Sequence, residues 1–193
     1  MCDHGVLTDF PAPEIDPYLV ARSHDTFHLR TLTTESFVDN RPRGVIGMVD
    51  GEITTTDAGY SDHIDVDKDI LKIAVVERHR NTKHVGVGYI KGYGLKRGAV
   101  ATSISHDSHN IIVVAEDGVS AAEVPLAIAG IMSDEPLTVV NEKLESAKEK
   151  AFTAGVSRGI DPFMTLSFMA LPVIPTLRIT TRGVYDVNSQ QYI

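Results

Sequence analysis

Short apolar runs separated by glycine and polar residues dominate the middle of the chain, from residue 70 to residue 115. Residues 70–76 and 111–115 are rich in β-branched side chains, and residues 85–93 and 99–104 are apolar runs that contain or adjoin glycines. Short apolar runs bounded by glycine and polar clusters are typical of strands. The pattern therefore predicts four closely spaced strands, and the last two flank the polar hexapeptide SHDSHN at residues 105–110.

Further strands are predicted on both sides of this stretch. The Asp50-Gly51 pair between residues 45–49 and 52–56 indicates a tight hairpin, since Asp-Gly readily adopts positive φ values. Residues 18–21 and 119–126 are also strand candidates, residues 33–37 suggest a brief helical turn, and residues 178–187 indicate a final turn or hairpin.

Two helices are predicted in the last third of the chain. Val140, Leu144, Ala147 and Ala151 repeat with a helical period, with Ser133 or Asp134 as the cap and Gly155 as the stop. A second, mostly buried helix is predicted to begin at Asp161 and to end before Pro172.

These elements predict an α+β fold, a mostly antiparallel sheet of about five to seven strands covered by two or more helices. Residues 1–43 contain four prolines and little periodicity, so they are interpreted as a lead-in, and residues 44–193 as one domain. Glycines 86 and 88 lie inside a strand-like run, which indicates β-bulges or close backbone approach rather than a nucleotide-binding loop, and no nucleotide cofactor is expected.

Composition narrows the function classes. The formal charge of -8 disfavours a nucleic acid partner, because binding a phosphate backbone calls for a basic field. No apolar run approaches the roughly 20 residues that span a bilayer, so no membrane partner and a cytoplasmic location are expected. The single Cys2 agrees with a reducing compartment. Five aspartates in residues 57–69 lack EF-hand spacing and are interpreted as a solvated loop.

The candidate chemistry follows two of the predicted strands. Alternation along residues 70–79 places Glu77 and His79 on one face, where the carboxylate could orient the ring or both could bind a metal; an ion-paired strand end is the alternative. In the hexapeptide, His106, Asp107 and His109 offer metal-binding donors, which could converge only if the chain turns there. A polar turn whose histidines satisfy backbone groups is the alternative.

Long strings of the chain resemble a known family. KIAVVERHRNT and GVGYIKGYGLKRGAVATSISHDSHNIIVV, followed by PLAIAGIMSD and DPFMTLSFMALPVIPTLRITTRGVYDVN, are similar in sequence and order to the C-terminal domain of bacterial adenine deaminase, in the amidohydrolase superfamily. One departure is that family members have about twenty further residues, a helix and a strand, where Ala115 here runs directly into Glu116.

The resemblance implies adenine deaminase chemistry, the hydrolysis of adenine to hypoxanthine and ammonia by a hydroxide activated on a divalent metal, Mn or Fe. The family's metal ligands lie mainly in a barrel domain with a His-x-His motif, which this chain lacks. The expected role is therefore to complete the cleft of a barrel domain or chain, with Glu77 and His79 as catalytic candidates. His106, Asp107 and His109 are then the cleft and metal candidates, and the chain alone is expected to be inactive.

Two alternatives remain open at this point. The same domain could be a non-catalytic docking module that uses residues 163–174 and a sheet face to bind a barrel or a second copy of itself. Its eight histidines could also build a freestanding metal-dependent hydrolase. A truncated gene, a cleaved chain or one part of a split enzyme would each explain a chain that starts here.

Overall fold

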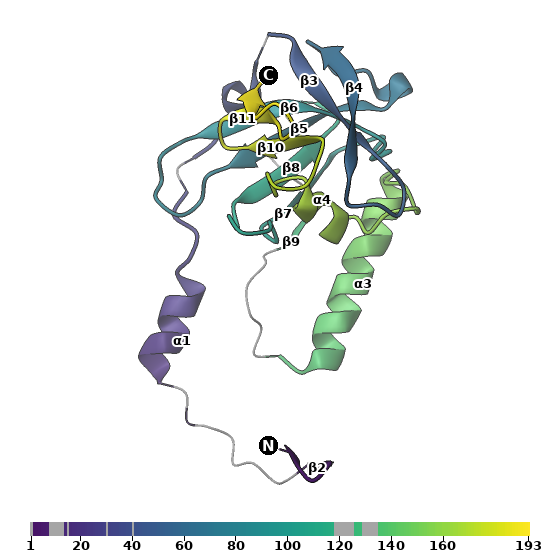
Figure 1. The fold of residues 1–193 in the computed structure, drawn as a ribbon. Helices are drawn as coiled ribbons and strands as arrows, with labels where there is room; N and C mark the ends of the chain where they lie inside the picture. Colours follow the sequence, from purple (N-terminus) through teal and green to yellow (C-terminus); the bar gives the residue numbers. More distant parts are fainter. Residues whose placement is uncertain are drawn as a thin grey trace.

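A seven-stranded mixed sheet forms the centre of the protein (Figure 1). The computed structural model describes residues 2–7, 14, 16–29, 31–39, 41–117, 126–128 and 135–193. The large sheet consists of β3 (Arg43–Met48), β4 (Thr55–Ser61), β5 (Ile70–Val76), β6 (Val85–Lys91), β7 (Ala99–Thr102), β8 (Ile111–Ala115) and β9 (Leu126–Ile128).

Two smaller sheets and three α-helices complete the described elements. The C-terminal sheet consists of β10 (Leu177–Thr180), β11 (Gly183–Asp186) and β12 (Gln191–Tyr192), and β1 (Cys2–Asp3) pairs with β2 (Val6–Leu7). The helices are α1 (Pro17–His24), α3 (Leu137–Thr153) and α4 (Met164–Phe168), and the 3₁₀ turns are η1 (Thr34–Phe37) and η2 (Val66–Lys68).

The strand order of the large sheet is β4-β3-β6-β5-β8-β7-β9. The β3–β6 and β7–β9 pairs are parallel and the other four pairs are antiparallel. The α+β class and the mostly antiparallel sheet are thus confirmed. The four strands expected from the apolar runs are the adjacent strands β6, β5, β8 and β7.

Alternation along β5 divides the core between the two faces of the sheet. Leu71, Ile73 and Val75 point into a large cluster that includes α4, the C-terminal end of α3 and the β10–β11 hairpin. Ala74 and Val76 face a smaller cluster on the second face, which Phe37 covers. Because neighbouring side chains leave a strand on opposite faces, an unbroken apolar run requires cover on both sides.

The β10–β11 hairpin lies directly against β6, in front of the sheet in Figure 1. A Cβ at Gly86 would lie 2.5 Å from the Gly183 nitrogen and would overlap the Thr180 carbonyl oxygen. Only glycine leaves room for this approach of two backbones. The close approach predicted at Gly86 is confirmed, and so is the final hairpin.

The helix predictions are confirmed in part. In α3, Val140, Leu144 and Ala147 are half-buried and Ala151 is fully buried, as the helical period predicts, and Gly155 follows the end of the helix with φ 111°. The candidate caps at 133–134 lie outside the described residues. The second helix is shorter than predicted: the Asp161 carboxylate accepts from the Met164 amide at 2.8 Å, but α4 has only five residues.

Three local predictions need correction. Residues 18–21 were predicted to form a strand, but they belong to α1, because Asp16 caps the first turn and Pro17 opens the helix. The brief helical turn predicted at residues 33–37 is confirmed as η1.

The hairpin after β3 is confirmed, but its connection spans residues 49–54, since Met48 pairs with Thr55. Residues 57–61 continue β4 instead of forming a loop. The strand candidate at 119–126 falls outside the described residues except for Leu126, which begins β9.

A buried arginine joins two connections beside the hairpin. Arg178 in β10 is fully buried, and its guanidinium donates to the carbonyl oxygens of Ile174 at 2.7 Å, Ile53 at 2.7 Å and Pro175 at 2.9 Å. Burial lowers the pKa of Arg178 to about 10, so the group remains charged at neutral pH. These bonds stabilise the loops at 49–54 and 171–176. Within the described part of the chain, no helix is long and apolar enough to cross a membrane.

Candidate functional site

The connection from β7 to β8 is a tight polar turn. The His109 amide donates to the Ser105 carbonyl oxygen at 2.7 Å, and Asp107 and His109 have φ values of 60° and 48°. Aspartate and histidine tolerate this left-handed region better than most residues. The Ser105 and Ser108 hydroxyls lie 3.2 Å apart and share a hydrogen bond. The turn predicted for the hexapeptide is confirmed.

His106 points from this turn into a cavity on the face covered by α4 and the C-terminal hairpin. Its ring lies 4.3 Å from the Phe168 ring, centre to centre, and its amide donates to the Ser167 carbonyl oxygen at 3.4 Å. The Nε2 atom is buried and has no hydrogen-bond partner among the described residues. A buried imidazole nitrogen without a hydrogen-bond partner destabilises the folded protein, so it marks a place where a ligand or another chain could supply that partner.

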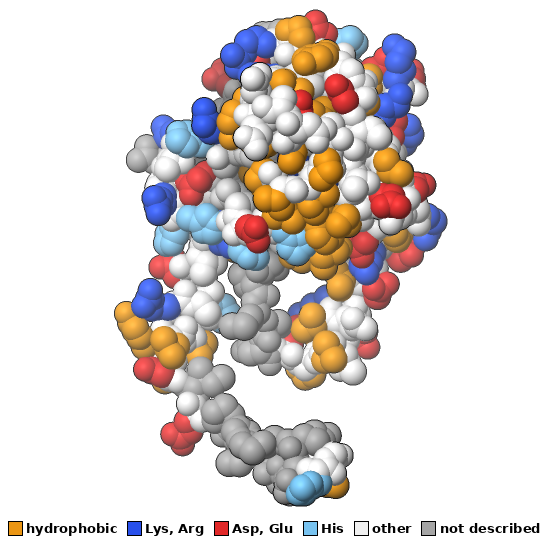
Figure 2. Space-filling model, viewed as in Figure 1, with side chains coloured by type: hydrophobic (Ala, Val, Ile, Leu, Met, Phe, Trp, Pro, Cys, Tyr) orange, Lys and Arg blue, Asp and Glu red, His pale blue; other side chains and the backbone are white. Residues whose placement is uncertain are grey.

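The cavity beside His106, which we call the His106 cavity, has a volume of about 370 Å³. Besides His106 it is lined by residues of β5, the turn, the loop after α4 and the C-terminal hairpin: Val75, Asp107, Ser108, Asn110, Ala170, Pro172, Val173, Ile179, Thr180 and Thr181. Figure 2 shows hydrophobic side chains gathered on this front face, with histidines at their border. An apolar cavity with a few polar groups is typical of a small-molecule site.

The turn does not gather the three predicted metal-binding side chains. Asp107 joins His106 at the cavity, whereas the His109 side chain is exposed and does not line it. No group of three or more His, Cys, Asp or Glu side chains that could hold a metal ion occurs in the described part of the chain. The residues present do not fit a complete metal site, and the metal role of His106, Asp107 and His109 stays a prediction.

Arg78 holds the turn in place through hydrogen bonds to His109 and Asn110. It is 5% exposed, its Nε donates to the His109 carbonyl oxygen, and its amide donates to the Asn110 side chain at 3.4 Å. Its guanidinium also donates to the Thr26 carbonyl oxygen and lies 4.4 Å from the centre of the Phe27 ring. Burial lowers the pKa of Arg78. Arg78 therefore holds both the turn and the lead-in segment in place.

The Glu77 carboxylate is hydrogen-bonded to residues of the loop that follows it. Its carboxylate accepts hydrogen bonds from the amides of His79 at 2.6 Å, Arg80 at 2.8 Å and Thr82 at 3.0 Å, and from the Thr82 hydroxyl at 2.9 Å. Partial burial raises the pKa of this carboxyl, but the four hydrogen bonds outweigh it and lower the pKa to about 2. A carboxylate held in this way is a weak base, so the geometry indicates a loop-stabilising role for Glu77.

His79 lies at the other side of the turn. Its Nε2 atom is 2.7 Å from the Ser108 carbonyl oxygen, and its ring lines a cavity of about 440 Å³ with Arg22, Asp25, Thr26 and His28. The structure therefore brings the His79 ring to the backbone of the hexapeptide, whereas the main-chain amide of His79 bonds to the Glu77 carboxylate. Glu77 and His79 do not form the carboxylate-imidazole pair that strand alternation suggested, because β5 ends at Val76 and the chain loops.

Sequence reasoning missed two features of this region. Ala170 and the β10–β11 hairpin line the His106 cavity, but they lie about 60 to 75 positions away in the sequence, and nothing local links them to the hexapeptide. Lys72 is a second omission. A lone cation inside the run ILKIAVV was a visible signal, because a lysine at a strand centre must be buried or snorkel.

Comparison with known proteins identifies the family. The profile of the "Adenine deaminase C-terminal domain" family matches residues 49–118 and 112–191, which together include most of the chain. The chain belongs to this family. The resemblance stated from the sequence is therefore confirmed.

Several curated relatives are named adenine deaminase. That of Bacillus subtilis (strain 168) is 45% identical over 152 residues, covering 67% of this chain and 26% of the relative. That of Methanothrix thermoacetophila is 43% identical over 189 residues, covering 81% of this chain and 33% of the relative. That of Nitratidesulfovibrio vulgaris (strain DP4) is 39% identical over 224 residues, covering 97% of this chain and 37% of the relative. The chain thus spans about a quarter to a third of the length of these relatives.

The comparisons also agree with a shortened connection after β8. For the Bacillus subtilis relative, 67% of 193 residues is about 129 residues, so about 23 of the 152 aligned positions have no counterpart here. The two segments of the family match overlap at residues 112–118, where the sequence predicts the missing residues. The chain therefore has fewer residues than this relative within the matched region.

Proposed function

We propose that this chain is the domain that completes the active-site cleft of an adenine deaminase, acting with an amidohydrolase barrel domain or chain on adenine. The observation that carries the proposal is the buried, unpartnered Nε2 atom of His106 at an apolar cavity. Family membership supplies the reaction, and the cavity supplies a place for this chain to take part in it.

The divalent metal, Mn or Fe, would be held by the barrel in this proposal. Bound there, it would supply the activated hydroxide for attack on the carbon that bears the exocyclic amine. The described residues of this chain form no complete metal site. The roles proposed for them therefore do not depend on a metal ion bound by this chain.

The residues of this chain would bind and orient the base. The His106 imidazole can donate to or accept from a purine nitrogen, because which role each ring nitrogen takes depends on the tautomer. Apolar walls such as Val75 and Ile179 favour a planar ring over water. Asp107 and Ser108 add polar groups at the rim, where the barrel would close over the site.

Reconstitution tests this proposal. Ammonia release from adenine would be measured for the 193-residue chain alone, and again after the separately produced barrel portion of the Bacillus subtilis relative is added with manganese. We expect no turnover alone and turnover in the mixture. Turnover by the chain alone would overturn the completing role, and a mixture no more active than the barrel portion would do the same.

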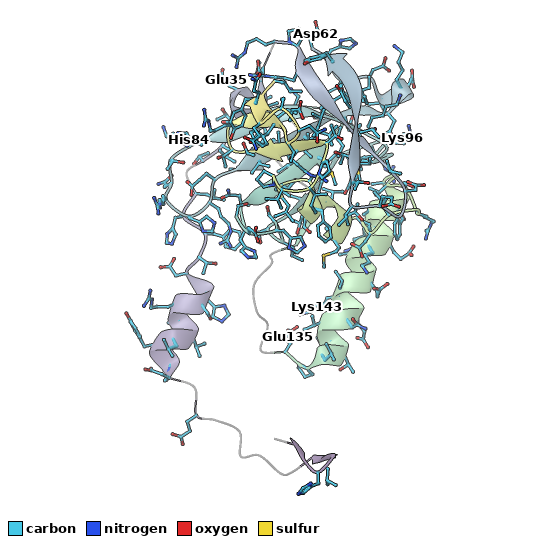
Figure 3. The ribbon with its side chains drawn as sticks, in the orientation of Figure 1. Glu35, Asp62, His84, Lys96, Glu135 and Lys143 are labelled. Carbon is cyan, nitrogen blue, oxygen red and sulfur yellow. The ribbon has the colours of Figure 1, made fainter. Side chains whose placement is uncertain are left out.

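A pair of variants tests the site itself. His106→Ala should lower turnover in the mixture by at least about tenfold, since a lost hydrogen bond to substrate costs about 1.4 kcal/mol or more. His84→Ala is the matched control, because His84, labelled in Figure 3, is exposed, and the hydrogen bonds it makes within the described part of the chain come from its backbone. Equal activity of both variants would refute the assignment of His106.

A docking role without a catalytic contribution is the second candidate function. Val173 and Met164 are 71% and 44% exposed on the face that carries the His106 cavity, and exposed apolar groups of this kind favour contact with another surface. Val173→Asp should then weaken binding to the barrel portion, measured by light scattering of the mixture. Docking alone is favoured if His106→Ala leaves turnover unchanged while Val173→Asp abolishes the complex.

A further inference from the structure

The second face of the sheet contains a buried cation that the proposed function does not use. Lys72 in β5 is 8% exposed and lies on the same face as Ala74 and Val76, opposite the His106 cavity. Its Nζ donates to the Phe37 carbonyl oxygen at 3.0 Å and lies 5.2 Å from the centre of the Tyr89 ring. An ammonium group has three N–H donors, so two have no acceptor within the described part of the protein.

These donors face a cavity of about 300 Å³, which we call the Lys72 cavity. Its walls come from η1, the end of β4 and the strands β5 and β6: Thr34, Phe37, Val38, Asp39, Asp62, His63, Ile64, Lys72 and Tyr89. Asp62 and Glu35, labelled near the upper end of the molecule in Figure 3, show where this region lies. The Tyr89 side chain is also buried, and burial raises its pKa, so its hydroxyl remains a hydrogen-bond donor.

The carboxylates near the cavity already have partners. Asp39 accepts from Arg43 at 2.7 and 2.9 Å and from Arg41 at 3.1 and 3.2 Å; burial opposes ionisation, but these bonds hold the pKa of Asp39 well below its usual range. The Asp62 carboxylate lies 2.6 Å from Nδ1 of His63 at the exposed rim. Among the charged groups that line the cavity, Lys72 is the buried one that retains unused N–H donors.

We propose that the Lys72 cavity binds a small organic carboxylate. One carboxylate oxygen would accept from the Lys72 ammonium and the other from the Tyr89 hydroxyl, while Phe37, Val38 and Ile64 would contact its hydrocarbon part. A charge-assisted pair of hydrogen bonds with apolar walls suits a monoanion with an apolar body. Phosphate fits less well, because it has no apolar part and its larger charge would meet Asp62 at the rim.

Benzoate is the probe that tests this site. Backbone amide shifts of the 193-residue chain would be followed by NMR during titration with benzoate, with inorganic phosphate as the comparison. We expect saturable shifts in Phe37 and Val38 for benzoate and at least about tenfold weaker binding of phosphate. No saturable shift with benzoate, or equal affinity for phosphate, would overturn the proposal.

Three variants separate the carboxylate site from a structural lysine. Lys72→Met should weaken benzoate binding by about tenfold or more, since it removes the charged donor. Tyr89→Phe removes only the hydroxyl and should weaken binding by at least about threefold, so the test survives if the lysine variant fails to fold. Asp62→Asn should strengthen binding by removing a like charge; weaker binding in this variant would indicate a cation site and refute the proposal.

The result is independent of the proposed deaminase role. The two cavities lie on opposite faces of the sheet, since Val75 lines the His106 cavity and Lys72 the other. Loss of benzoate binding therefore tests the Lys72 cavity alone, and loss of turnover in His106→Ala tests the other.

Discussion

Gly86→Ala tests how the C-terminal hairpin is seated on the sheet. An added Cβ would lie 2.5 Å from the Gly183 nitrogen and 2.8 Å from the Thr181 carbonyl carbon, and it would overlap the Thr180 carbonyl oxygen. All three neighbours are backbone atoms, which cannot rotate away. The hairpin must therefore move as a unit, and with it Thr180 and Thr181 at the His106 cavity.

The free energy of unfolding should fall measurably. Overpacking of this kind costs about 3 kcal/mol, and the lower entropy of the unfolded alanine chain returns less than about 1 kcal/mol. A net loss of about 2 kcal/mol corresponds to a fall in Tm of about 4–8 °C for a chain of this size. Thermal unfolding followed by circular dichroism measures this shift.

Gly44→Ala is the matched control. Its Cβ would lie 2.6 Å from Cδ1 of Ile193, which is the end of a flexible side chain at the C-terminus. That side chain can rotate, so the change in Tm should stay within about 2–4 °C. If Gly86→Ala melts within about 2 °C of the parent chain, or no lower than Gly44→Ala, the seating of the hairpin on β6 is refuted.

Three further changes have clear expected outcomes. Arg178→Met leaves the carbonyl oxygens of Ile174 and Ile53 without the donors that the guanidinium supplies and should cost about 2–5 kcal/mol, seen as a large fall in Tm; an unchanged Tm would contradict this. Glu77→Gln should destabilise the chain at neutral pH. The pKa of Glu77 falls from 4.5 to about 2 on folding, so its contribution to the free energy of unfolding is complete above about pH 4.5 and is lost as the pH falls toward 2. Plots of Tm against pH for the parent and the variant should therefore converge near pH 2; parallel plots would contradict this role. Asp161→Ala removes the acceptor for the amides of Phe163 and Met164 at the start of α4 and should cost about 1 kcal/mol, whereas Asp161→Asn keeps an acceptor oxygen and should retain most of that stability; equal Tm values for the two variants would argue against this role.

The sequence alone determined the centre of the fold. The apolar runs at 70–76 and 111–115 coincide with β5 and β8, because a run of β-branched residues that is buried on both faces has few other stable conformations. The polar hexapeptide at 105–110 was also predictable as a turn, since its Asp, Ser and Asn side chains favour local hydrogen bonds. These are local properties, and they do not depend on distant contacts.

Tertiary structure decided what the local patterns could not. Glu77 and His79 separate because the strand ends at Val76, and Arg78 is buried because the turn and lead-in supply acceptors from distant positions. The His106 and Lys72 cavities likewise join residues far apart in the sequence. Their chemistry depends on which chain segments meet, and that is fixed by packing rather than by any local preference.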